Sequence, residues 1–545
     1  MRSKLASLLI LGASAALAQD PAPPAPPIPT FSELVEVRVL DLDVDVTDAK
    51  GNPVTDLKRE DFTVRIGKQT VPIDYFARVD QGAIHAPDLA SASPDQVLST
   101  YRKGEEAFVP RNFLIYVDLG FLSPGVRNRS LEAIRDFVTR LGPDDAARVV
   151  VFDRSPKVLA DWTTSKEVVM SALSSIESKG VGMSRLQAER QTLSLIDSTP
   201  RGRRGGTRTQ LARQYGEEVG QEIERMLGSM RDELVTLTPL NGKRSFLFLS
   251  GGFEYQPGFV MSQYAGGGAA SLTAFNIRNI SGEVQSLVKR ANTDEITFYT
   301  IDALGLTGEG GNASNDDPLG NRPGVSFQAR ADRQNGMQEL AAETGGLALL
   351  NTNDFDRGLN KVFQAVSTYY TVGVTLAKLD STAYEDVRVA VNRPGVVVRA
   401  RRGFQALPEA DLVRDRALAT METDLSYNAI PVRLQTAPPT PDKKLFSLPI
   451  TVMVPASALT FTPEGERSTA RADIFIGSVD DKGRRSEITR QEANFQVPAD
   501  QAAGNTPVQF NARLMTKKGN YRIVVNVRDS VTGKMGTARA NVRVE

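Results

Sequence analysis

Hydrophobic residues between positions 109 and 405 form short continuous runs, separated by stretches in which apolar residues recur at helical spacing. Residues 113–117 and 246–249 are continuous apolar runs, which is typical of strands buried on both faces of a parallel sheet. Residues 127–141 carry apolar side chains every three or four positions, which predicts an amphipathic helix. Because strands and helices alternate, the sequence predicts an α/β fold with a doubly wound sheet covered by helices on both faces.

The two flanking regions have the period-two pattern of β-strands. Residues 33–79 alternate apolar and polar side chains over short runs, which predicts a small β module. Residues 443–545 contain regularly spaced runs with turn residues between them, which predicts a β-sandwich. Residues 80–108, which are polar and weakly periodic, and residues 406–442, which end in a proline-rich stretch, are predicted as linkers.

The first 18 residues have the pattern of an export signal. Two basic residues precede an apolar run over residues 5–17, and the small-residue pattern Ala16-Leu17-Ala18 predicts cleavage after its last residue. The run is shorter than the roughly 20 residues that a membrane-spanning helix needs. Residues 19–32 are rich in proline and are predicted as an extended linker. We therefore expect an exported protein, periplasmic or secreted to the cell surface or medium, without a transmembrane segment.

The composition excludes several classes of function. Lys plus Arg and Asp plus Glu both number 65 in the 545 residues, so no net charge draws the chain to nucleic acid or to an anionic membrane. The absence of cysteine excludes disulfides, thiol nucleophiles, thiolate metal sites and a lipid anchor on an N-terminal cysteine. The single histidine, His85, lies in a predicted linker, and neither a Gly-x-Ser-x-Gly motif nor a phosphate-binding loop occurs. We expect no catalytic residues, no small-molecule cofactor and no enzyme activity.

In residues 112–152 a buried run is closed by Asp118, and a predicted helix then leads to Asp144-Asp145-Ala146-Ala147-Arg148-Val149. This segment resembles a von Willebrand factor type A domain. Gly51-Asn52-Pro53-Val54 upstream and residues 393–404 downstream extend the likeness over about residues 31–404, so that the chain is similar to exported von Willebrand factor A-related domain proteins of Acidobacteria. The resemblance implies a von Willebrand factor A-like, Rossmann-like fold for residues 109–405.

The resemblance also implies a metal-ion-dependent adhesion site at the carboxyl edge of the sheet. Such a site holds Mg²⁺ with an Asp-x-Ser-x-Ser loop, a distant threonine and a distant aspartate, which together supply the oxygens that this hard cation prefers. Asp118 matches the first position, but glycine and leucine stand at the two serine positions, and Ser123 follows one residue late. Ser184 is the shifted substitute for the threonine, and residues 250–252 offer no aspartate. The predicted metal site is therefore incomplete, with Asp118 as its carboxylate and weak Mg²⁺ binding at most.

Asp302 closes another predicted strand and is a further candidate at the same edge. In the usual strand order its strand is next but one to that of Asp118, or roughly 10 Å away at about 4.8 Å per strand. Asp118 also has an alternative role, because a short carboxylate often caps a helix or holds a loop turn. The candidate binding residues are Asp118, Ser123, Ser184 and Asp302, with Asp118 as the metal candidate.

These features predict a non-enzymatic interaction or adhesion protein whose partner is a protein or another component of the cell envelope. The carboxyl edge of an open α/β sheet is the expected place for the ligand. Two alternatives stay open. One is a Mg²⁺-dependent adhesion domain that uses Asp118, Ser123 and Ser184, and the other is a hydrolase with an unrecognised site.

Overall fold

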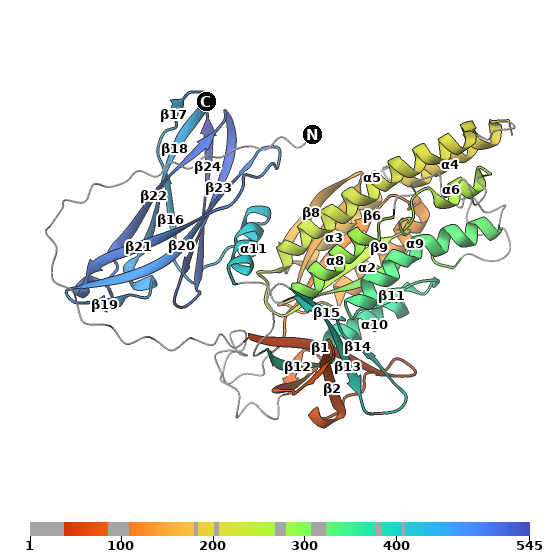
Figure 1. The fold of residues 1–545 in the computed structure, drawn as a ribbon, viewed down its shortest axis with the longest axis horizontal. Helices are drawn as coiled ribbons and strands as arrows, with labels where there is room; N and C mark the ends of the chain where they lie inside the picture. The colour runs from red at the N-terminus through yellow and green to blue at the C-terminus, as the bar shows by residue number, and fades with distance from the viewer. Residues whose placement is uncertain are drawn as a thin grey trace. The chain divides into compact units, whose positions relative to one another are not determined.

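The computed structural model divides the chain into two compact units, one over residues 37–407 and one over residues 408–545 (Figure 1). The predicted signal peptide, the proline-rich segment and most of the predicted linker 80–108 lie outside the described residues. The structure describes residues 38–85, 108–178, 184–200, 206–266, 279–306, 323–376, 383–405 and 409–545.

A six-stranded sheet forms the centre of the first unit. Its strands are β6 (Arg111–Asp118), β7 (Ala146–Asp153), β8 (Ser155–Thr163), β9 (Lys243–Ser250), β10 (Ile296–Asp302) and β11 (Ala348–Leu349). The order is β11-β10-β9-β6-β7-β8, and every neighbouring pair is parallel except β7 and β8. The continuous apolar runs lie in β6 and β9, where side chains on both faces need burial.

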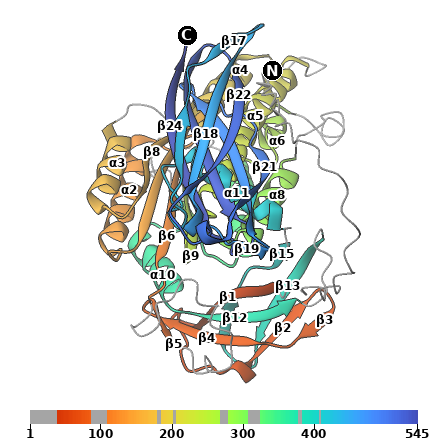
Figure 2. The same cartoon turned by 90° about the vertical axis from the view of Figure 1, so that its left-hand side faces the viewer.

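Helices cover both faces of this sheet, as the alternating pattern predicts. One face packs against α2 (Pro124–Thr139), α3 (Lys166–Ser178) and α10 (Phe355–Ser367), and the other against α5 (Gly206–Leu237), α8 (Ser281–Thr293) and α9 (Pro323–Glu343) (Figure 2). Two further helices, α4 (Ser184–Ser198) and α6 (Phe259–Tyr264), lie on the α5 side. The mixed α/β class is thereby confirmed. No helix in the described ranges combines the length and the apolarity that crossing a membrane requires.

The N-terminal β module is built from both ends of the first unit. One sheet has the order β14-β1-β12-β4-β5 and the other β15-β13-β2-β3, and both cover one apolar core. The upstream elements are β1 (Arg38–Asp48), η1 (Arg59–Asp61), β2 (Phe62–Ile66), β3 (Gln69–Val71), β4 (Tyr75–Asp80) and β5 (Ala83–His85). The downstream strands are β12 (Tyr369–Leu376), β13 (Tyr384–Val391), β14 (Val396–Arg399) and β15 (Gly403–Gln405). Strands that the sequence analysis attributed to the end of the central domain therefore complete the module at its start.

The second unit contains two antiparallel sheets around a shared core. One sheet consists of β16 (Arg433–Thr436), β17 (Thr440–Asp442), β18 (Leu445–Pro455) and β22 (Pro507–Thr516). The other consists of β19 (Thr462–Glu464), β20 (Arg467–Asp480), β21 (Thr489–Pro498), β23 (Gly519–Asp529) and β24 (Met535–Val544). Two short 3-10 helices, η2 (Ala456–Ala458) and η3 (Ala499–Gln501), occur in its connections.

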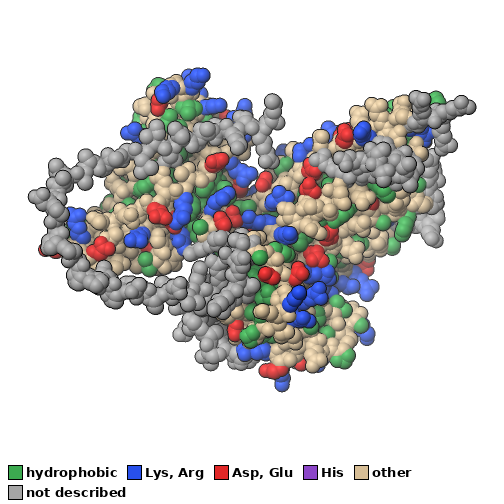
Figure 3. Space-filling view, viewed as in Figure 1, with side chains coloured by type: hydrophobic (Ala, Val, Ile, Leu, Met, Phe, Trp, Pro, Cys, Tyr) green, Lys and Arg blue, Asp and Glu red, His purple; other side chains and the backbone are tan. Residues whose placement is uncertain are grey.

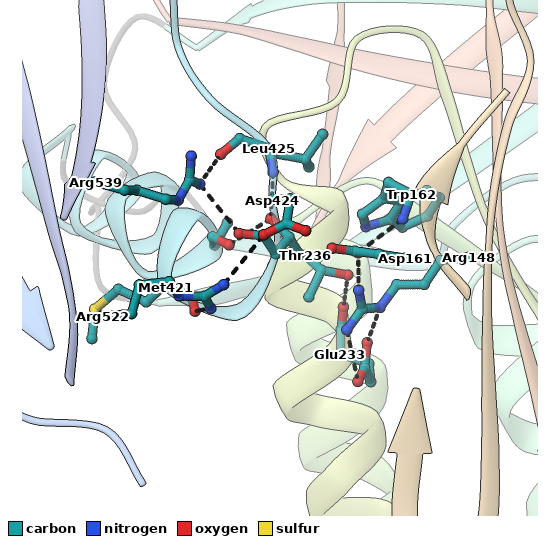
Figure 4. A network of polar contacts seen from close by, with 12 residues as sticks. Arg148, Asp161, Trp162, Glu233, Thr236, Met421, Asp424, Leu425, Arg522 and Arg539 are labelled. Atoms are coloured by element: carbon teal, nitrogen blue, oxygen red, sulfur yellow. Dashed lines mark hydrogen bonds and ion pairs between the residues drawn. The ribbon is translucent and has the colours of Figure 1, made fainter. Parts of the chain in front are cut away.

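The segment 406–442, predicted as a linker, contains a helix and the first two strands of this second unit. Helix α11 (Glu409–Glu422) packs against β20 and β23, and its end is held by two arginines. Arg522 donates to the Met421 carbonyl at 2.7 Å, and Arg539 donates to the Thr423 carbonyl at 3.2 Å (Figure 4). Backbone carbonyls at a helix C-terminus lack helical partners, so these guanidinium groups satisfy them.

Candidate functional site

Asp118 ends strand β6 at the carboxyl edge of the central sheet and is fully buried. The backbone N–H of Gly120 donates to its Oδ1 at 3.1 Å, and the Ser250 hydroxyl donates to its Oδ2 at 2.6 Å. The Arg185 guanidinium donates to both carboxylate oxygens. Within the described ranges, the carboxylate of Asp118 thus accepts hydrogen bonds from Gly120, Ser250 and Arg185.

Arg185 lies in the first turn of α4 and is fully buried, like its partner carboxylate. Its Nε atom lies 3.8 Å from Oε1 of Glu222 on α5, and its guanidinium carbon lies 5.3 Å from the centre of the Phe121 ring. A charge in a protein interior is retained only when it is paired, and here two carboxylates and an aromatic face surround one cation. The edge of the sheet thus contains a fixed positive charge that the chain itself supplies.

The position of the Arg185 side chain explains why residue 120, in the loop after β6, is a glycine and not a serine. A Cβ atom on Gly120 would overlap the Arg185 guanidinium, so only glycine leaves room for that side chain. The Gly120 carbonyl also accepts hydrogen bonds from the backbone N–H groups of Arg185, at 3.0 Å, and Leu186, at 3.1 Å. The first turn of α4 is therefore attached to the loop by its backbone as well as by its ion pair.

A second buried ion pair attaches the next turn of α4. Glu189 accepts a hydrogen bond from Arg333 of α9 at 2.5 Å, and both side chains are almost completely buried. The Arg333 guanidinium lies 4.0 Å from the centre of the Phe121 ring, so Phe121 contacts both arginines. Helix α4 consequently closes this part of the carboxyl edge with two ion pairs.

The other predicted site residues lie near this edge, and each has hydrogen-bond partners of its own. Ser123 is buried at the N-cap position of α2, where its carbonyl accepts from Arg127 N at 2.9 Å. The Ser184 hydroxyl donates to Glu222 Oε1 at 2.7 Å, next to Arg185. The structure therefore brings Ser184 into the surroundings of the ion pair and leaves Ser123 in a helix cap.

Asp302 ends β10, which β9 separates from β6, so the two carboxylates belong to next-but-one strands. Its Oδ2 accepts from Gln334 at 2.6 Å and from Arg330 at 3.3 Å, and its Oδ1 accepts from Leu304 N at 3.0 Å. Burial raises the pKa of Asp302, and the bonds from Gln334 and Arg330 oppose that rise. Asp302 thus belongs to a separate cluster between β10 and α9.

The residues around Asp118 do not fit a divalent cation. Mg²⁺ requires about six oxygen ligands in an octahedral arrangement. Both oxygens of Asp118 are bound by a guanidinium, and Gly120 supplies no side-chain oxygen. Across the part of the chain that the structure describes, no three or more His, Cys, Asp and Glu side chains are grouped so that they could hold a metal ion.

Arg185 is the site residue that the sequence analysis missed. Its neighbour Ser184 was predicted because hydroxyl groups are the expected ligands of the cation, whereas a side chain that replaces the cation has no position in that motif. The missing hydroxyl at Gly120 was the available signal, since a glycine at a ligand position leaves space for a larger group. The group that fills this space is the Arg185 side chain, which contacts Asp118 from 67 positions away. The local sequence pattern does not predict such a contact.

Two apolar side chains are exposed at the same edge of the sheet. Leu306 follows β10 and is 56% exposed, and Phe327 lies near the start of α9 and is 76% exposed. Arg330, one turn after Phe327, donates to the Gly305 carbonyl as well as to Asp302, which fixes the start of α9 at this edge. Exposed large apolar groups are typical of contact surfaces, and the carboxyl edge of an open α/β sheet is the usual place for a ligand in such folds.

No protein-family model matches the chain, and no curated protein matches it. Among solved structures, an aerotolerance-related membrane protein from Bacteroides fragilis is 12% identical over 47% of this chain and 98% of its own, with a TM-score of 0.22. The protein BatB from Bacteroides thetaiotaomicron is 12% identical over 47% of this chain and 97% of its own, with a TM-score of 0.21. A von Willebrand factor type A structure from Catenulispora acidiphila is 8% identical over 89% of this chain and 73% of its own, with a TM-score of 0.24. At such scores these likenesses carry no argument about function.

Proposed function

We propose that this chain is an exported, non-enzymatic interaction protein of the adhesion type, built on a von Willebrand factor A-like domain with a degenerate metal site. The observation that carries the proposal is the Arg185 guanidinium, which binds both oxygens of Asp118 at the edge where metal ligands are expected. A tethered guanidinium supplies the positive charge that a bound cation would supply, and it requires no ion from solution. Partner binding is therefore metal-independent in this proposal.

The exposed side chains of Leu306 and Phe327 support an interaction role for this edge. An exposed aromatic ring supplies contact area at little conformational cost, and aromatic residues are enriched in protein interfaces. The charged groups beside them, Asp302 and Arg330, already bind each other. The partner proposed for this edge is accordingly an apolar surface of an envelope protein.

Capture from a cell-envelope fraction of the source organism tests this proposal. The full chain is immobilised and compared with a Leu306→Ser/Phe327→Ser variant, both in EDTA and in MgCl₂. Val531→Ser is the matched control, because Val531 is 66% exposed in the second unit. The proposal predicts the same partner with and without Mg²⁺, loss of capture in the double variant and no change in the control.

Three results would count against this reading. Capture of no partner in any salt or metal condition would remove the interaction role. Capture that requires Mg²⁺, together with heat in a calorimetric Mg²⁺ titration, would favour the Mg²⁺-dependent alternative through Asp118, Ser123 and Ser184. Turnover of an ester, peptide or glycoside by the purified chain would replace the proposal with a hydrolase.

A further inference from the structure

A polar cavity of about 50 Å³ lies between strand β1 of the N-terminal β module and the central sheet, with room for a few water molecules. Lys243, where β9 begins, and Ile296, where β10 begins, both line it. The cavity is therefore at the amino edge of the sheet, opposite to Asp118. Basic and acidic side chains lie close together on the face where β15 is labelled (compare Figures 1 and 3).

The lining of this cavity contains four carboxylates and three cations, so that one negative charge is in excess when all of them are ionised. Alternate residues of a strand point to the same side, which is why three aspartates of β1 face the cavity together. Two tyrosines, Tyr299 of β10 and Tyr369 of β12, also line it. The charged residues are Asp41, Asp43 and Asp45 of β1, Lys243 of β9, Glu295 before β10, Arg399 of β14 and Arg401 before β15.

Each of the three cations has a carboxylate of its own. The ion pairs are Lys243–Asp43 at 2.7 Å, Arg399–Asp45 at 2.7 Å and Arg401–Glu295 at 3.1 Å. Within the described ranges, Asp41 is the one carboxylate of this set that has no ion pair. The excess charge of the cavity therefore belongs to Asp41.

Arg401 connects β1 to the central domain beside Asp41. Its side chain is 8% exposed, and its guanidinium donates to the backbone carbonyls of Asp41 and, at 2.7 Å, Asn292 near the end of α8. The same guanidinium pairs with Glu295, in the turn between α8 and β10. One buried cation thus joins the module to the domain at the place where the unpaired carboxylate lies.

Asp41 changes its charge near neutral pH. Partial burial, followed by repulsion from Glu295 and Asp43, raises the pKa of Asp41 from 3.8 to about 7, and Arg401 opposes this rise. The residue is in part exposed to solvent, so its proton exchanges with the medium. Asp41 is therefore neutral in mildly acid solution and ionised in mildly alkaline solution.

The phenols beside Asp41 do not titrate in this range. Burial and the charge of Asp41 raise the pKa of Tyr75 of β4 to about 12. Burial also raises the pKa of Tyr299, well above its usual value of 10.0. Both rings stay neutral while Asp41 titrates.

We propose that Asp41 is a pH-sensitive switch in the contact between β1 and the amino edge of the central sheet, closed while Asp41 is protonated and loosened when it ionises. Ionisation adds a fourth carboxylate beside three cations that are already paired, and it repels Glu295 on the domain side. Because the closed form binds the proton more tightly, its advantage is present below pH 4 and is lost as the pH rises through 7. This inference goes beyond the proposed function, since it concerns the opposite end of the sheet from Leu306 and Phe327.

The first half of β1 is the segment where loosening should be measured. Residues 38–44 pair with β12, whereas β14 pairs with β1 only from Asp45 to Asp48. A strand with one neighbour opens locally at lower cost than a strand with two, and hydrogen exchange measures such opening. The amides of residues 38–44 should therefore report the state of the switch.

Hydrogen exchange of the full chain between pH 5 and pH 8, followed by mass spectrometry of peptides that cover residues 38–44, tests the proposal. Each rate is divided by that of an unstructured chain at the same pH, which gives a protection factor. Wild type is compared with Asp41→Asn, which cannot ionise, and with Glu295→Gln, which removes the repelling carboxylate. Asp136→Asn is the matched control, because Asp136 is an exposed aspartate of α2 in the same unit.

The proposal predicts that protection of residues 38–44 falls at least tenfold from pH 5 to pH 8 in wild type and in Asp136→Asn. In Asp41→Asn it should stay at the acid value throughout, and in Glu295→Gln the midpoint should move to lower pH. Protection independent of pH in wild type, a decline that persists in Asp41→Asn, or an unchanged midpoint in Glu295→Gln would overturn it. Partner capture by the carboxyl edge is a separate readout, so failure here is distinguishable from failure of the proposed function.

Discussion

Replacement of Arg185 by methionine removes the cation from the carboxyl edge while keeping an apolar stem of similar length. Asp118 then retains only the Gly120 N–H and the Ser250 hydroxyl as donors in a fully buried position. Breaking a buried ion pair by removal of one partner costs roughly 3–5 kcal/mol, because the remaining charge is desolvated and unpaired. The free energy of unfolding of the first unit should fall by that amount.

Urea unfolding followed by tryptophan fluorescence measures this change in the correct unit, because Trp162, the only tryptophan, lies in β8. Arg393→Met is the matched control, since Arg393 pairs with Asp56 at the surface and exposed pairs contribute about 0–1 kcal/mol. The double variant Asp118→Asn/Arg185→Met should lose less than the two single variants together, by about 2 kcal/mol or more. A loss below about 1 kcal/mol for Arg185→Met, or strictly additive effects, would show that Arg185 and Asp118 do not stabilise the unit as a buried ion pair.

Three further predictions concern the same unit and use the same unfolding assay. Gly120→Ala should lower the free energy of unfolding by roughly 1–3 kcal/mol, because the added Cβ overlaps the Arg185 guanidinium. Gly125→Ala is the control and should not destabilise the unit, because a Cβ there would contact nothing within 4 Å. Equal effects of the two substitutions would contradict this prediction. In the wild type, Nε of Arg148 lies 2.8 Å from Oε2 of the buried Glu233 (Figure 4). Arg148→Met should lower the free energy of unfolding by roughly 3–5 kcal/mol, because Glu233 then has no cation beside it. A loss as small as that of a surface ion pair would contradict this prediction. Burial and the neighbouring carboxylate of Glu254 raise the pKa of Asp332 from 3.8 to about 6. The contribution of Asp332 to stability is therefore present below pH 4 and is lost as the pH rises through 6. Asp332→Asn should flatten this decline of the unfolding free energy with pH, and an unchanged pH profile would contradict the prediction.

The local pattern of the sequence was sufficient for the central sheet. The runs at 113–117 and 246–249 lie in β6 and β9, because a strand buried on both faces must be apolar at every position. These strands depend on residues that are neighbours in the sequence, and the local sequence pattern therefore predicts them.

In the N-terminal β module, the local sequence pattern predicts strands but not their partners. The alternation in residues 38–48 predicts a strand with one buried face, but it does not identify β12 and β14, more than 320 residues later, as its partners. Pairing over that separation is decided by the complete set of strands that share one core. The Arg185–Asp118 pair could not be predicted for the same reason, since a buried arginine has the same local sequence pattern as an exposed one.

Titration of Mn²⁺ followed by electron paramagnetic resonance shows whether the carboxyl edge at Asp118 binds a divalent cation, since Mn²⁺ takes the oxygen ligands that suit Mg²⁺. Wild type, Asp118→Asn and Arg185→Ser/Gly120→Ser are compared as full chains. If the Arg185 guanidinium takes the place of the cation, wild type and Asp118→Asn bind Mn²⁺ equally weakly, and only the variant that introduces two hydroxyls and removes the guanidinium gains a site. Stoichiometric Mn²⁺ bound to wild type and lost in Asp118→Asn would contradict the account.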